Sequence, residues 1–149
     1  MLPYMIKLPM RQLHLDFHNS PHMPDIAVDF DPARFVADLQ GAHVTSVTCF
    51  SRCHHGLIYH DTRRFPRLKH PHLGRDLLGE QIAACHGAGI RAPIYITVGW
   101  DDIQRRAHPE WLERDEAGQA PGPGPLEAGF DQKLCLGSGY VDFVAAQTA

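Results

Sequence analysis

Alternating and helical patterns of apolar residues divide the chain into strands and helices that follow one another in turn. Residues 12–18 alternate apolar and polar side chains, which is the period of a β-strand. Residues 44–51 and 91–98 are rich in β-branched and aromatic side chains and predict two further strands. The predicted order is strand, helix, strand, helix, strand, loop and helix.

Each predicted helix follows a residue that is suited to cap it. Asp31 precedes Pro32, which needs no amide partner in a first helical turn, and apolar residues then recur at helical spacing. Asp76 takes the same place before the second helix, and a short helix is expected over residues 102–107. A last helix is expected to begin after Ser138.

A helix between successive strands predicts parallel pairing through right-handed crossovers. Three such strands suit either a small doubly wound sheet or the opening of a barrel. A complete barrel needs about 250 residues, so 149 residues hold three to four of its eight units. We expect an α/β fold, a partial (β/α)8 TIM barrel that is a fragment of a longer protein. Residues 1–149 form one segment, with a Pro/Gly-rich loop over residues 117–139.

Composition excludes several classes of partner. A net charge of −3 gives no electrostatic reason to expect nucleic acid or an anionic membrane. The longest apolar stretch, residues 92–100, is about half the length of a membrane span, and residues 1–10 lack the apolar core of a signal peptide. The four cysteines form no CxxC pair, which favours a reducing, cytoplasmic location.

Polar and aromatic side chains gather where each predicted strand ends. In parallel α/β folds the loops that follow the strands converge at this edge and form the active site. Imidazole and carboxylate groups bind hydroxyls, and an indole stacks on the apolar face of a sugar ring. We therefore expect a carbohydrate-binding mouth made by His14, Asp16, His18, His54, His55, Trp100 and Asp101.

Other interpretations of these residues stay open. Adjacent side chains diverge along a strand, so at most one of His54 and His55 is expected to face the site. Trp100 suits an aromatic plug as well as it suits a sugar platform, and Asp101 suits a helix cap.

Metal binding is the rival chemistry for these side chains. His and Asp are typical ligands of zinc or iron. However, side chains on one face of a strand lie about 6.6 Å apart, so one ion reaches two of the three on residues 14–18. We expect neither a metal nor a cofactor, and a metal-dependent hydrolase is the further alternative.

Six segments, in this order and at this spacing, carry a resemblance to a known family. The chain resembles hypothetical glycoside hydrolases related to the α-L-fucosidase barrels, some of them beside β-galactosidase-like proteins. The match covers roughly residues 11–115. Its segments are Gln12–His18, Phe30–Phe35, Cys53–Gly56, Arg75–Glu80, Ala88–Ile90 and Tyr95–Asp101.

The resemblance implies roles for particular residues. Fucosidases line the sugar pocket with a first-strand His, a Lys-His-His-Asp-Gly stretch after strand two and a Trp near the end of strand three. The counterparts here are His14 or His18, the His54-His55 pair and Trp100. Cys53 and Gly56 flank the pair where the family has Lys and Asp, so the match leaves fucose specificity open.

The family's carboxylate nucleophile follows strand four, which places it beyond residue 149, and the catalytic residues are unknown. Retaining hydrolysis needs two carboxyl groups about 5 Å apart, so the chain alone is expected to be inactive. The alternative is a sugar-binding or structural remnant without turnover.

The third strand would also expose an unpaired edge, which predicts self-association as a homo-oligomer.

Overall fold

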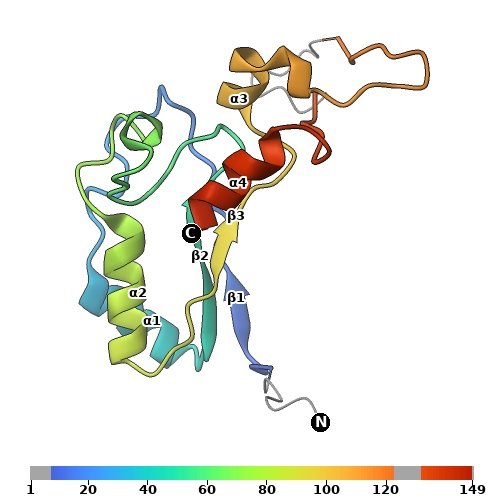
Figure 1. Cartoon of the computed structure of the whole chain (residues 1–149). Coiled ribbons are helices and arrows are strands. Elements are labelled where there is room, and N and C mark those ends of the chain that lie inside the picture. Colours follow the sequence, from blue (N-terminus) through green and yellow to red (C-terminus); the bar gives the residue numbers. More distant parts are fainter. Residues whose placement is uncertain (1–7, 123–131, 149) are drawn as a thin grey trace.

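The computed structural model describes residues 8–122 and 132–148. Helices alternate with three strands, as the sequence predicts (Figure 1). Part of the predicted loop over residues 117–139, residues 123–131, lies outside the described residues. In chain order the elements are β1 (Gln12–His14), α1 (Pro32–Gly41), β2 (Ser46–Arg52), η1 (Pro66–Leu68), α2 (Leu77–Gly87), β3 (Ile94–Ile96), α3 (Asp102–Ala107), η2 (Pro109–Trp111) and α4 (Tyr140–Thr148).

The strands form one parallel sheet in the order β1-β2-β3. The α/β class and the parallel pairing are confirmed, and the arrangement is that of a partial, barrel-like fold. His14 lies opposite Thr48, and Phe50 lies opposite Tyr95. The register shifts between Phe50 and Arg52, so β2 changes its alignment with β3 where its polar end begins.

Both outer strands are shorter than predicted. β1 pairs with β2 only as far as His14, whereas alternation predicts a strand to residue 18. Backbone pairing beside β3 begins at Arg91, whose carbonyl accepts from the Val47 amide at 2.9 Å. Pro93 has no N–H to donate, so the regular ladder begins at Ile94.

Three helices begin at the aspartates that the sequence assigns to their caps. The Asp31 side chain accepts from the Arg34 amide at 2.9 Å, and Asp76 accepts from the Gly79 amide at 2.9 Å. Asp101 accepts from the Gln104 amide at 3.0 Å. Each carboxylate satisfies an amide that has no partner within its own helix.

Helices α1 and α2 cover the same face of the sheet. Figure 1 shows α1 and α2 side by side on one side of the strands. Val47 and Cys49 from β2 pack there against Leu39 of α1 and against Leu78 and Cys85 of α2. The alternation of β2 therefore directs every second side chain into this layer and leaves its other side chains for the opposite face.

A separate small core follows β3. Leu112, Leu134 and Tyr140 form a small buried cluster that joins η2 to the start of α4. In the part of the chain that the structure describes, no helix has the length and apolar character needed to cross a membrane.

Candidate functional site

Five of the predicted side chains gather at the carboxyl ends of β1 and β2. We call them the histidine cluster: His14, Asp16, His18, His54 and His55. The strand of residues 14–18 ends early, yet its polar side chains stay together. The Asp16 Oδ1 atom lies 3.0 Å from His18 Nε2 and 4.0 Å from His14 Nε2.

Two aromatic rings underlie the cluster. The rings of Phe50 and Tyr95 stack with centroids 4.2 Å apart, as their register in the sheet allows. The His14 ring lies 5.4 Å from Phe50 and 5.5 Å from Tyr95. The His18 ring meets Phe50 edge-on at 5.0 Å. This aromatic pair fixes two imidazoles by packing, so their orientation depends on the sheet itself.

The hydrogen bonds of His18 define its tautomer. Its Nδ1 atom accepts from the His54 backbone N–H at 3.3 Å, so that nitrogen carries no proton. In the neutral ring the proton then resides on Nε2, which donates toward Asp16 at 3.0 Å. His18 thus links the loop after β2 to the carboxylate after β1.

The His54-His55 pair lies in a tight turn. The Gly56 amide donates to the Cys53 carbonyl at 3.0 Å, and Gly56 has a φ of +83° that glycine adopts without strain. The His54 ring lies 4.3 Å from the His55 ring and 4.2 Å from the His18 ring. The divergence expected of adjacent side chains applies to a continuing strand, and His54 and His55 lie in a turn instead.

Burial keeps the central imidazoles neutral. It lowers the pKa of His54 to about 4, and the nearby His55 and His18 act in the same direction. Burial likewise lowers the pKa of His18, and Asp16 opposes this shift. Near pH 7 each of these rings therefore carries one N–H donor and one acceptor nitrogen, and those of His18 are engaged by Asp16 and by the His54 backbone N–H.

Trp100 and Asp101 follow β3 but are placed differently from the histidines. The Trp100 ring is partly exposed, with Lys133 Nζ 4.9 Å from its centroid. Asp101 is 2% exposed and forms an ion pair with Arg52. Burial raises the pKa of Asp101 and the Arg52 charge opposes that shift. Asp101 is thus a structural cap, and its carboxylate does not face a solvent-filled mouth.

Sequence reasoning missed two residues of this region. Arg52 ends β2 with its side chain buried, and Tyr140 begins α4 with none of its surface exposed. The Tyr140 hydroxyl accepts from Arg52 Nη2 at 3.0 Å across 88 residues of sequence. The sequence does carry a signal for this pairing, because Arg52 ends a strand that is otherwise uncharged, and buried charges are paired.

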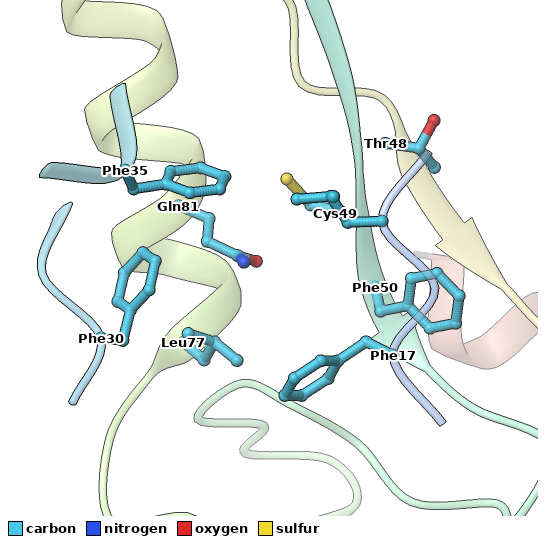
Figure 2. Close-up of a pocket in the computed structure, with 9 residues that line it drawn as sticks. Phe17, Phe30, Phe35, Thr48, Cys49, Phe50, Leu77 and Gln81 are labelled. Atoms are coloured by element: carbon cyan, nitrogen blue, oxygen red, sulfur yellow. The ribbon is translucent and has the colours of Figure 1, made fainter. Parts of the chain in front are cut away.

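A cavity of about 210 Å³ separates the sheet from the helices. Figure 2 shows Phe30, Phe35 and Leu77 on one side of it and Cys49, Phe50 and Phe17 on the other. Thr48 and Gln81 add polar atoms to this mostly apolar lining. The cavity lacks the convergent polar groups that a sugar needs, so the histidine cluster is the candidate site.

Among residues 8–122 and 132–148, no group of three or more His, Cys, Asp or Glu side chains lies close enough to hold one metal ion. Within the histidine cluster Asp16 Oδ1 lies 3.0 Å from His18 Nε2, and the His54 and His55 rings pack at an angle of 40°.

The chain has clear similarity to known carbohydrate-active proteins. Alpha-L-fucosidase isoenzyme 2 from Paenibacillus thiaminolyticus is 40% identical over 94% of this chain, with a TM-score of 0.80. This chain spans 21% of the length of that fucosidase. An alpha-L-fucosynthase from Thermotoga maritima shares the fold alone, with 19% identity over 82% of this chain and 25% of its own, and a TM-score of 0.53.

None of the curated proteins matches the chain. The family model described as hypothetical glycosyl hydrolase 6 matches residues 31–149, a range that includes the His54-His55 turn and Asp101. The chain therefore belongs to the hypothetical glycosyl hydrolase 6 family.

Proposed function

We propose that this chain supplies sugar-binding residues of an α-L-fucosidase-like glycoside hydrolase. The observation that carries the proposal is the gathering of the histidine cluster at the carboxyl ends of β1 and β2. Identity of 40% to an α-L-fucosidase over 94% of the chain supports an L-fucoside as the substrate class. Because the chain spans 21% of that enzyme's length, hydrolysis is proposed for the whole protein.

The cluster offers the right chemistry for a small polyol. His54 and His18 are neutral at physiological pH, so a sugar that binds beside them does not bury a charged imidazole. Asp16 is an exposed acceptor beside them. Trp100 is partly exposed after β3, and we propose it as a platform for an apolar sugar face.

The cluster is proposed to bind and not to cleave. Retaining cleavage uses two carboxyl groups about 5 Å apart, and Asp16 is the carboxylate among the five residues of the histidine cluster. We therefore propose that the nucleophile and the acid lie outside the histidine cluster. A sugar-binding chain without turnover is the second candidate function, and the same single carboxylate favours it.

Calorimetric titration of the chain with L-fucose tests the proposal. We expect a millimolar Kd for the unaltered chain and no measurable heat for a variant that combines His54→Ala and His55→Ala. His86→Ala is the matched control, because His86 is exposed on α2 at the opposite end of the sheet, and it should bind as the unaltered chain does. Equal binding by the His54/His55 double variant would remove these residues from the site.

A further inference from the structure

A buried ion pair joins three parts of the chain beneath the histidine cluster. The side chains of Arg52 and Asp101 are 1% and 0% exposed and are bonded through Arg52 Nη1 and Asp101 Oδ2. Arg52 Nη2 also donates to the Thr97 carbonyl, and to the Tyr140 hydroxyl at 3.0 Å. One guanidinium thereby connects the end of β2, the loop after β3 and the start of α4.

The stability of the fold does not by itself account for this pair. Removing two charges from water carries a desolvation penalty that their attraction often fails to exceed, and apolar replacements are frequently as stable. A buried pair does fix geometry, because each charge accepts only an arrangement that keeps it paired.

The His54-His55 turn adjoins both members of the Arg52–Asp101 pair. Arg52 lies two residues before His54 on the same strand end. On the other side, a Cβ built on Gly56 would lie 2.3 Å from Asp101 Oδ1, so the turn packs directly against the carboxylate. The Asp102 amide also donates to the His54 carbonyl at 3.0 Å. The turn thus follows Arg52 directly along the chain and packs against the Asp101 carboxylate.

We infer that Arg52 and Asp101 are positioning residues that set the orientation of His54 and His55. The inference rests on the proposed sugar-binding function, and it reassigns Asp101 from a sugar ligand to a support behind the ligands. It also gives Tyr140 a role, since the Tyr140 hydroxyl orients the Arg52 guanidinium from α4.

Two conservative variants break the bond between Arg52 and Asp101 while keeping side chains of similar size. Asp101→Asn keeps the size and the helix-capping oxygen but turns an amide donor or a neutral oxygen toward Arg52. Arg52→Lys keeps the charge but cannot reach Asp101, Thr97 and Tyr140 together, because lysine lacks the planar fork. Leu39→Ala is the control, since Leu39 is buried between the helices and the sheet on the far side of β2 and its loss lowers stability alone.

The readouts are the imidazole proton resonances of His54 and His55 in the full chain and the Kd for L-fucose. We expect both pair variants to shift these resonances and to weaken fucose binding at least about tenfold, while Leu39→Ala lowers the melting temperature and leaves both readouts unchanged. Unchanged His54 and His55 resonances in both pair variants would overturn the inference.

The same experiment separates this inference from the proposed function. If the unaltered chain binds no L-fucose but the pair variants still move the His54 and His55 resonances, the fucose proposal fails and the positioning role stands. If the unaltered chain binds L-fucose and the pair variants match it in Kd and in resonances, the positioning role fails and the binding proposal stands.

Discussion

The His54 backbone N–H donates to His18 Nδ1 at 3.3 Å, and the rings of His18 and His54 lie 4.2 Å apart. One contact needs an unprotonated Nδ1 on His18, and the other brings together two rings that repel when both are charged. The loop after β1 and the turn after β2 are therefore joined by groups that must stay neutral. Protonation of these imidazoles in mildly acidic solution weakens both contacts at once.

Stability should fall as the pH is lowered through this range. Burial lowers the pKa of His54 from its ordinary 6.5 to about 4, so between these values the unfolded chain binds a proton that the folded chain does not. The free energy of unfolding then decreases from the upper value toward the lower one. His18 shifts in the same direction.

Urea unfolding at about pH 7 and about pH 5 measures the effect. We expect His54→Gln to lose less stability between the two conditions than the unaltered chain loses. His86→Gln, on the exposed end of α2, should keep the full loss. Identical pH dependence for His54→Gln and the unaltered chain would contradict the burial of a neutral imidazole.

Asp16→Asn tests the carboxylate of the histidine cluster. The Asp16 side chain is 70% exposed, so its replacement should change stability by less than about 0.5 kcal/mol. Its bond to His18 and its place at the mouth predict fucose binding weaker by about fivefold. Asp38→Asn is the matched control, because Asp38 is an exposed acid on α1. Equal Kd values for the two variants would exclude Asp16 from the site.

Gly56→Ala tests the packing of the turn on Asp101. The positive φ and the approach of 2.3 Å to Asp101 Oδ1 act together, and we expect a loss of about 3 kcal/mol in the free energy of unfolding. Gly89→Ala has a similar φ of +70° with open space at its Cβ, so it should cost about 1 kcal/mol. Chemical denaturation compares them, and equal losses would show that Asp101 does not confine the turn.

Ile94→Lys tests the exposed edge of the sheet. Ile94 on β3 is 54% exposed, and Val98 just beyond it is 44% exposed. An apolar edge strand pairs readily with other chains, and an edge lysine opposes such pairing. Sedimentation velocity should show that Ile94→Lys shifts the chain toward the monomer, whereas Val141→Lys on α4 does not. A monomeric unaltered chain would contradict the predicted self-association.

Local chemistry explains why the element order could be predicted from sequence. The caps at Asp31 and Asp76 depend on a side chain and an amide three residues apart, and residue type alone reveals them. The positions of the strands follow equally from β-branched runs. The lengths of the strands could not be predicted in this way. β1 pairs only where β2 runs beside it, and Pro93 interrupts the ladder beside β3.

The candidate site was only partly accessible to such reasoning. Polar residues at strand ends predicted the histidine cluster, because parallel strands bring their carboxyl ends to one edge. The close approach of the His54 and His55 rings depends on the turn at Gly56, and the Arg52–Tyr140 bond spans 88 residues. Contacts of this kind are set by tertiary packing, and no local pattern encodes them.

Site-resolved NMR of the imidazole ring protons during titration with L-fucose tests the central claim most directly. We predict that the resonances of the four cluster histidines, His14, His18, His54 and His55, move with one common Kd, while those of the remote, exposed His43 and His86 stay fixed. D-fucose, the mirror-image sugar, should leave all of them unchanged. Cluster resonances that stay fixed with L-fucose, or that move equally with D-fucose, would contradict a fucose-binding site at the ends of β1 and β2.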